Sequence, residues 1–225
     1  MDFKRFTHSD EWQNFAFEYV KESINTALLT EKVVRVVVSG GNTPKVLYSQ
    51  IAASNLPLNR VEVFQVDERY VARDSTDLNA NMLRATLLKN IVNFADVHLF
   101  DIELKWQEAA KTYNALLQSL PEPMFHLTIL GLGPDGHTAS LFPYSAALFS
   151  EDFVATSTTE TFAGHARLTL TPRALLQSEN ILILATGKDK KIVVDSFIAG
   201  KESVENLPIM CVRNHPKVTL VYGEF

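Results

Sequence analysis

The chain has 225 residues, of which 46% are hydrophobic, and its formal net charge is −5 at neutral pH. This length suits a single domain over residues 1–225 with a buried core, and the negative charge argues against a nucleic-acid-binding protein. The single cysteine, Cys211, excludes an internal disulfide and a cysteine-rich metal site, and its apolar surroundings in the sequence are typical of a buried thiol. Since no apolar run reaches the length of a membrane span and no signal peptide opens the chain, we expect a cytoplasmic protein without membrane contact.

Predicted strands and helices alternate along the chain. Apolar segments typical of strands lie at 33–38, 61–66, 96–100, 125–130, 153–156, 166–170, 180–185, 208–212 and 217–221. Segments that favour helices lie at 11–29, 44–54, 79–90, 105–119, 172–178 and 188–199. This alternation predicts a Rossmann-like α/β fold, with a mostly parallel sheet and helices on both faces. Because no helix fits between 153–156 and 166–170, a short antiparallel excursion is expected there.

The first motif follows the apolar segment 33–38. It consists of small and polar residues, namely Ser39, Gly40, Gly41, Asn42 and Thr43. Pro44 suits the first position of the next helix and Thr43 suits its N-cap. A loop of small residues that opens a helix offers free backbone N–H groups to a phosphate. The spacing matches neither the P-loop nor the dinucleotide fingerprint, and an ordinary tight turn needs the same glycines.

A second motif, Asp67-Glu68-Arg69, follows the apolar segment 61–66. Taken alone, it is more often a solvated turn with a surface ion pair. A parallel sheet, however, gathers the carboxyl ends of its strands along one edge, where a carboxylate and a guanidinium can serve a common cleft.

The third motif is the longest, running from Gly131 to Pro143 after the apolar segment 125–130. Its glycines allow a sharp turn and a close approach to a ligand. Within it, the imidazole of His137 can exchange a proton near neutral pH, and Asp135 can orient that ring or only cap the turn.

Together these segments resemble the 6-phosphogluconolactonase family, and the resemblance extends to Arg167-Leu168-Thr169-Leu170-Thr171 and to Thr186-Gly187-Lys188-Asp189-Lys190. It implies a Rossmann-like enzyme that hydrolyses 6-phospho-D-glucono-1,5-lactone to 6-phosphogluconate in the oxidative pentose phosphate pathway. The wider superfamily implies that Arg167 and Lys190 are cations for the phosphate. The sequence does not decide between Lys188 and Lys190.

Lactone hydrolysis requires a base for water, a site for the oxyanion and a proton for the leaving oxygen. We expect His137 to move the proton, with His165 as the reserve candidate. Arg69 can bind the oxyanion or a sugar oxygen, and Asp67 can hold a hydroxyl. Either Asn79 or Asn81 supplies the amide that the family carries downstream. No cofactor or metal is expected, because no cluster of ligands has metal-binding spacing.

Two other functions compete with the lactonase. The glucosamine-6-phosphate deaminases share the scaffold, but their members usually carry Ile-Ala-Phe-Asn-Glu-Pro after the histidine and Tyr after Asp-Glu. This chain has the segment 138–143, Thr-Ala-Ser-Leu-Phe-Pro, and Arg69 at those places. A non-catalytic sugar-phosphate sensor is the third possibility, against which the joint presence of Asp67, Arg69, Asp135 and His137 argues. The expected assembly is a monomer or a weak homo-oligomer.

Overall fold

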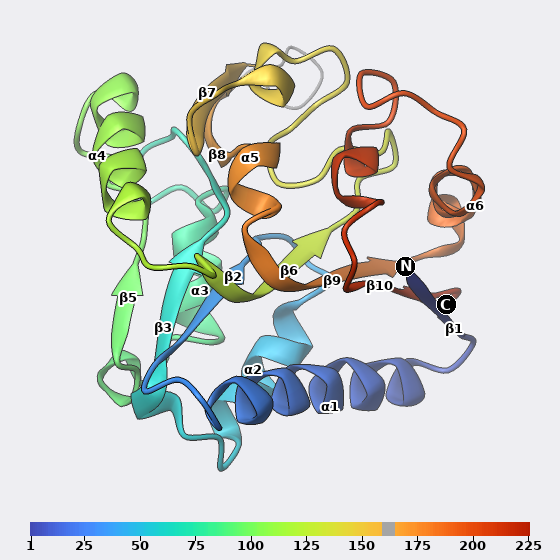
Figure 1. Ribbon diagram of the computed structural model, residues 1–225, viewed down its shortest axis with the longest axis horizontal. Coiled ribbons are helices and arrows are strands. Elements are labelled where there is room, and N and C mark those ends of the chain that lie inside the picture. Colours follow the sequence, from blue (N-terminus) through green and yellow to red (C-terminus); the bar gives the residue numbers. More distant parts are fainter. Residues whose placement is uncertain (159–164) are drawn as a thin grey trace.

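The computed structural model describes residues 1–158 and 165–225 and contains two sheets flanked by helices (Figure 1). The strands are β1 (Asp2–Phe6), β2 (Val34–Val38), β3 (Val61–Gln65), β4 (Asp67–Arg69), β5 (Asp96–His98), β6 (Phe125–Gly131), β7 (Val154–Thr158), β8 (Ala166–Leu170), β9 (Ser178–Thr186) and β10 (Val218–Gly223). The α-helices are α1 (Ser9–Ala27), α2 (Lys45–Ala53), α3 (Asn79–Ala85), α4 (Trp106–Gln118), α5 (Pro172–Leu175) and α6 (Lys191–Ala199). Short 3₁₀ helices are η1 (Leu58–Arg60), η2 (Ile91–Asn93), η3 (Ala146–Phe149), η4 (Lys188–Lys190) and η5 (Pro208–Val212). Within the described residues, no helix combines the length and the apolar character that crossing a membrane requires.

The larger sheet has seven parallel strands in the order β1-β10-β9-β6-β2-β3-β5. From β2 the chain moves outward in one direction to β3 and β5, then returns to the other side of β2 with β6. The strand order therefore reverses between β2 and β6, and ligands bind at such a point in open α/β sheets. The predicted parallel α/β fold is confirmed, and the loops after β2 and β6 carry the first and third motifs.

Helices cover both faces of this sheet, so alternate residues of its strands are buried in two separate hydrophobic clusters, one on each face. Ile181 and Ile183 of β9 pack with α4, α5 and α6, whereas Leu182 and Leu184 pack with α1 and α2. In Figure 1, α1 and α2 lie below the sheet and α4 and α5 above it. Strands buried on both sides are nearly all apolar, which explains why 33–38 and 180–185 could be predicted from composition alone.

The second sheet is antiparallel, with strand order β4-β8-β7. The predicted antiparallel excursion at 153–156 and 166–170 is thus confirmed as β7 and β8. Its third strand, β4, was not predicted, because it is short and follows β3 after only one intervening residue. Val66 joins the two sheets: its N–H donates to Val38 (3.0 Å), and its carbonyl accepts from the N–H of Leu170 (2.8 Å).

Several predicted elements were wrong in type or length. Segment 208–212 is not a strand but the 3₁₀ helix η5, which has a proline in its first turn and buries Ile209 and Val212, three residues apart. The helices expected at 79–90 and 172–178 end early, at Ala85 and Leu175. The strand β1 was missed, because its side chains are intermediate or exposed at this edge of the sheet.

The cap expected from Thr43 was also wrong. Pro44 takes the N-cap position of α2, with no side-chain cap hydrogen bond. The hydroxyl of Thr43 instead lies 3.2 Å from that of Thr186, at the end of β9. The side chain therefore ties the loop after β2 to the end of β9 rather than capping the helix.

Candidate active site

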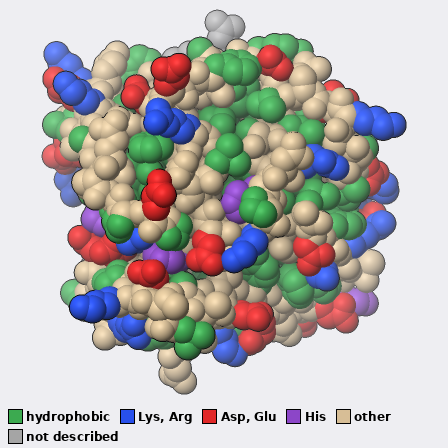
Figure 2. All heavy atoms as spheres, viewed as in Figure 1, with side chains coloured by type: hydrophobic (Ala, Val, Ile, Leu, Met, Phe, Trp, Pro, Cys, Tyr) green, Lys and Arg blue, Asp and Glu red, His purple; other side chains and the backbone are tan. Residues whose placement is uncertain are grey.

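A cavity of about 200 Å³ opens at the carboxyl ends of the parallel strands, beside the point where the strand order reverses. Its walls include Lys190 and residues from all three motifs, namely Ser39, Gly40, Gly41, Asn42, Thr43, Asp67, Arg69 and His137. Acidic and basic side chains are interspersed over the face seen in Figure 2. Binding of an anion in this cavity would therefore depend on the charged groups and the N–H groups of the cavity walls, not on the charge of the surrounding surface.

The imidazole of His137 is paired with the carboxylate of Asp135. Nδ1 of the ring lies 2.5 Å from Oδ1 of Asp135, and the same oxygen accepts the main-chain N–H of His137 (3.2 Å). Burial on its own would raise the pKa of Asp135, but the hydrogen bond and charge of His137 outweigh it and lower that pKa below its ordinary value. Asp135 therefore fulfils both roles that the sequence left open, since it caps the turn and orients the ring.

The backbone of this turn needs glycine at two places. A Cβ on Gly133 would lie 2.1 Å from Nδ1 of His137, and Gly136 has a φ of +81°. The turn closes through hydrogen bonds from the N–H of Gly133 to the carbonyl of His137 (2.8 Å) and from the N–H of Gly136 to the carbonyl of Gly133 (3.1 Å). The imidazole thus packs directly on the main chain at Gly133, where a larger residue would collide with the ring.

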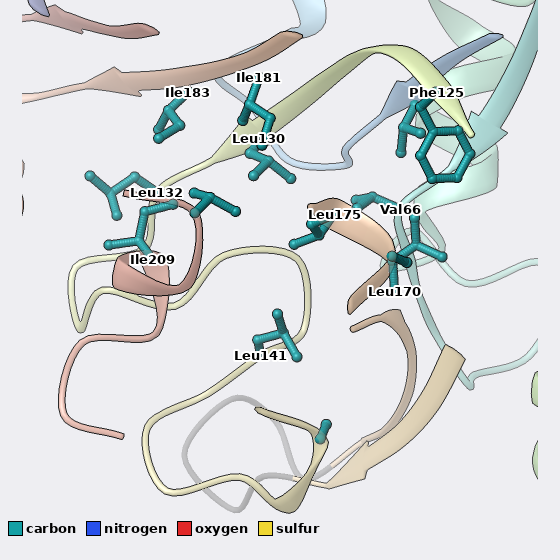
Figure 3. Close-up of a cluster of buried hydrophobic side chains, with 14 of the residues drawn as sticks. Val66, Phe125, Leu130, Leu132, Leu141, Leu170, Leu175, Ile181, Ile183 and Ile209 are labelled. Atoms are coloured by element: carbon teal, nitrogen blue, oxygen red, sulfur yellow. The ribbon is translucent and has the colours of Figure 1, made fainter. Parts of the chain in front are cut away.

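Hydrophobic anchors hold both ends of the loop that carries His137. Leu132 and Leu141 are buried in the core cluster drawn in Figure 3, where Leu132 lies near Ile209 of η5. The N–H of Ile209 also donates to the carbonyl of Gly136 (2.9 Å). The segment wrongly predicted as a strand thus supports the turn that carries His137.

Asp67 is held on both oxygens at the wall of the cavity. Its Oδ2 accepts from the hydroxyl of Ser140 (2.7 Å), and its Oδ1 accepts from Nδ2 of Asn79 (3.3 Å). Asn79 also lines the cavity, whereas Asn81 donates to the carbonyls at 73 and 75 outside it. The structure thus brings Asn79, not Asn81, to the site. Ser140 was missed by the sequence analysis; the only signal was its place in the long motif.

Glu68 was also missed as a site-related residue, although it stands between Asp67 and Arg69. It points away from the cavity, is fully buried (0% exposed) and accepts hydrogen bonds from β4, from α3 and from the carboxamide of Gln65. Alternation along a strand explains why its neighbours face the cavity and Glu68 does not.

Arg69 and Arg167 stand opposite each other in the β4–β8 ladder. Arg69 donates from Nη1 to the carbonyl of Asp77 (2.6 Å), and its buried Nε has no hydrogen-bond partner among the described residues. Arg167 is buried, and the central carbon of its guanidinium lies 5.7 Å from the ring centre of Phe142. Burial and the neighbouring charge of Arg69 lower the pKa of Arg167. Arg69 lines the cavity and Arg167 does not.

The glycine loop is fixed at its start by a buried tyrosine. The hydroxyl of Tyr48 accepts the N–H of Ser39 and donates to its carbonyl, both at 3.0 Å. Gly41 has a φ of +92°, a conformation that favours glycine. Lys190 also lines the cavity, and burial lowers its pKa, whereas Lys188 is not part of the wall. His165 lies 3.9 Å from Asp77 and does not line the cavity.

A larger groove of about 640 Å³ runs between α4 and β7. Its walls carry Lys111 and Asp152 but neither histidine nor arginine from the described part of the chain. In residues 1–158 and 165–225, no three His, Cys, Asp or Glu side chains gather as a metal-ion site would require. We therefore place the chemistry in the smaller cavity, where the three motifs meet.

The fold and the cavity together define an α/β enzyme whose pocket lies at the switch point of a parallel sheet. The sequence profile of one family, described as glucosamine-6-phosphate isomerases/6-phosphogluconolactonase, matches residues 7–221. The chain belongs to this family.

Relatives within the family include proteins of known structure. The 6-phosphogluconolactonase of Thermotoga maritima is 33% identical over 205 residues, which cover 86% of this chain and 92% of that protein. A 6-phosphogluconolactonase of Helicobacter pylori strain J99 is 32% identical, covering 95% of this chain and 93% of the relative. The crystal structure of the Thermotoga maritima enzyme superimposes with a TM-score of 0.87, at 28% identity over 99% of this chain and 100% of the other.

Proposed function

We propose that this protein hydrolyses 6-phospho-D-glucono-1,5-lactone to 6-phosphogluconate, a step of the oxidative pentose phosphate pathway. The observation that carries the proposal is the His137–Asp135 pair, which stands at a cavity whose other walls hold the glycine loop and Lys190. The similarity to enzymes named 6-phosphogluconolactonase supports the same substrate.

In this proposal, His137 moves the proton. An ionised Asp135 accepts the hydrogen of Nδ1, so the lone pair of the imidazole lies on Nε2. Nε2 takes a proton from water as the water oxygen forms a bond to the lactone carbonyl carbon. When the tetrahedral intermediate collapses, the bond between that carbon and the ring oxygen breaks, and the imidazolium returns the proton to the leaving oxygen.

Arg69 is the charged group proposed for the oxyanion or for a sugar oxygen. Its side chain lines the cavity, so its positive charge stands at this wall. Asp67, fixed by Ser140 and Asn79, is proposed to accept a hydrogen bond from a sugar hydroxyl.

The phosphate is proposed to bind at the other end of the cavity. The loop of Ser39, Gly40, Gly41, Asn42 and Thr43 offers backbone N–H groups, and Lys190 adds a positive charge. Arg167, which is paired with Arg69 in the β4–β8 ladder but does not line the cavity, is proposed to add its charge to the same site. We further infer that the enzyme works as a monomer or a weak homo-oligomer, because the described residues of one chain bring these groups together. The cytoplasmic location expected from the sequence is part of the same proposal.

The test is enzyme-dependent hydrolysis of freshly prepared 6-phosphogluconolactone, with the spontaneous background subtracted, measured beside ammonium release from glucosamine 6-phosphate. We expect fast lactone hydrolysis and no ammonium release. Ammonium release without accelerated lactone hydrolysis would instead identify a deaminase. Binding of 6-phosphogluconate without either activity would identify a sensor.

A further inference from the structure

Glu68 is a charged group that the proposed reaction does not use directly. Its side chain is fully buried and accepts four hydrogen bonds, all from neutral amide groups. Oε1 accepts the main-chain N–H groups of Arg69 and Asn79, both at 2.7 Å. Oε2 accepts the main-chain N–H of Ala80 at 2.8 Å and Nε2 of Gln65 at 2.7 Å.

This arrangement fits an ionised carboxylate. A carboxylate offers about four lone-pair positions, and here four donors share its two oxygens. A protonated acid would direct its hydrogen against one of the four donors. Burial is the largest influence and leaves the pKa of Glu68 above its ordinary value, although the hydrogen bonds from Gln65, Ala80, Asn79 and Arg69 lower it in part.

Asn79, whose main-chain N–H donates to Glu68 at the start of α3, also lines the cavity between Asp67 and the glycine loop. Nδ2 of Asn79 lies 3.1 Å from the carbonyl and 3.3 Å from Oδ1 of Asp67. On its other side, Asn79 packs so closely under Gly40 that a Cβ there would lie 2.0 Å from Oδ1 of Asn79. The position of Asn79 therefore sets the separation between Asp67 and the glycine loop.

We propose that Glu68 is a positioning residue of this enzyme, whose buried carboxylate fixes the start of α3 so that Asn79 holds Asp67 and the glycine loop in working geometry. This inference rests on the proposed lactonase function, because it concerns the same cavity. Glu68 itself touches neither the cavity nor the reacting atoms; it acts through Asn79.

The first test is Glu68→Gln, which keeps the shape but turns an N–H group toward main-chain N–H donors. We expect kcat to fall about 100-fold, as misplacement of a site by roughly 1 Å does, while KM for the lactone rises only about threefold, because Lys190 and the backbone N–H groups of the shifted loop still bind the phosphate. Glu62→Gln is the matched control: Glu62 lies on β3, near the opposite end of the sheet, and makes no contact with the cavity. If Glu68→Gln and Glu62→Gln gave the same kcat, the proposal would be overturned.

A second test separates positioning from general destabilisation. In the Asn79→Ala background, Glu68→Gln should reduce kcat by only about threefold or less, because residues that act as one unit are not additive. Losses that multiply would show that Glu68 does not act through Asn79. If Glu68→Gln does not fold, Gln65→Met removes one of the four donors, and we expect a smaller loss in kcat with KM unchanged; an unchanged kcat would refute the proposal.

The wild type, Glu68→Gln, Asn79→Ala and the double variant also distinguish this inference from the proposed function. A wild-type protein that hydrolyses no lactone would refute the function. The positioning role would then be judged by the affinity for 6-phosphogluconate, which should fall in Glu68→Gln and in Asn79→Ala but no further in the double variant. An unchanged affinity in Glu68→Gln would overturn it.

Discussion

The two ends of the parallel sheet use the same kinds of side chain for different purposes. At the amino end, Arg35 and His126 are buried, and the guanidinium donates to the carbonyls of Met124 and Pro123, both at 2.7 Å. Nδ1 of His126 accepts the main-chain N–H of Arg35 (2.9 Å). At the carboxyl end, the histidine and arginine line a cavity instead.

The difference lies in what the strand ends require. The amino end must satisfy main-chain carbonyls, and its arginine does so with hydrogen bonds that close the surface. At the carboxyl end, the glycine turn lets the ring of His137 pack directly on the main chain, and the carboxylate of Asp135 fixes that ring. A histidine or arginine in an α/β sheet thus indicates a functional site only when its fixed position faces a cavity.

The largest effect is expected from His137→Ala. We expect kcat to fall about 10²- to 10⁴-fold, as loss of a general base does, with little change in stability, because the ring lies at the cavity surface. Steady-state kinetics and urea unfolding would measure both. His8→Ala, at the exposed start of α1, is the control. Wild-type kinetics in His137→Ala would exclude it as the base.

A smaller loss is expected from Asp135→Asn. The variant removes the negative charge that orients the ring, so kcat should fall about 10- to 100-fold, as it does for other partners of functional histidines. Because the folded pKa of Asp135 lies below its ordinary value, its carboxylate stabilises the fold above the unfolded pKa of about 3.9, and this contribution is lost as the pH falls through the lower folded value. Wild-type kcat in Asp135→Asn would show that it only caps the turn.

Lys190→Ala should change binding rather than turnover. Loss of a positive charge near the phosphate should raise KM for the lactone about tenfold and leave kcat nearly unchanged. Lys188→Ala, two residues away and outside the cavity wall, is the matched control. Equal KM values in the two variants would contradict the phosphate assignment, as would an unchanged KM in Arg167→Ala.

The smallest effect concerns the amino end. Burial and the charge of Arg35 lower the pKa of His126, so the unfolded chain binds a proton more readily than the folded protein once the pH drops below about 6.5. This residue therefore reduces the free energy of unfolding as the pH falls, by at most about 1.4 kcal/mol per pH unit. His126→Asn should be less stable at pH 7.5, approach the wild type at pH 5.5 and keep wild-type kcat. A gap in stability that stays constant with pH would exclude a neutral buried His126.

The sequence predicted the parallel sheet and the three motifs, because apolar runs and glycine turns are local signals. It did not predict which polar residues support the site. Glu68 and Ser140 act through contacts with other segments of the chain, such as Ser140 with Asp67, and only such contacts distinguish Asn79 from the other candidate, Asn81. The 3₁₀ helix η5 was mistaken for a strand, because a short apolar run carries too little periodicity to separate the two.

The pairing of β1 with β10 has a consequence for how the protein is made. β1 lies at the edge of the sheet and hydrogen-bonds to β10, although all the other described strands come between them along the chain. During synthesis, β1 must therefore wait for β10 before its partner exists. Contacts between such distant segments also slow folding. The sheet, and with it the edge next to β9 and Lys190, is therefore complete only after β10 has been synthesised.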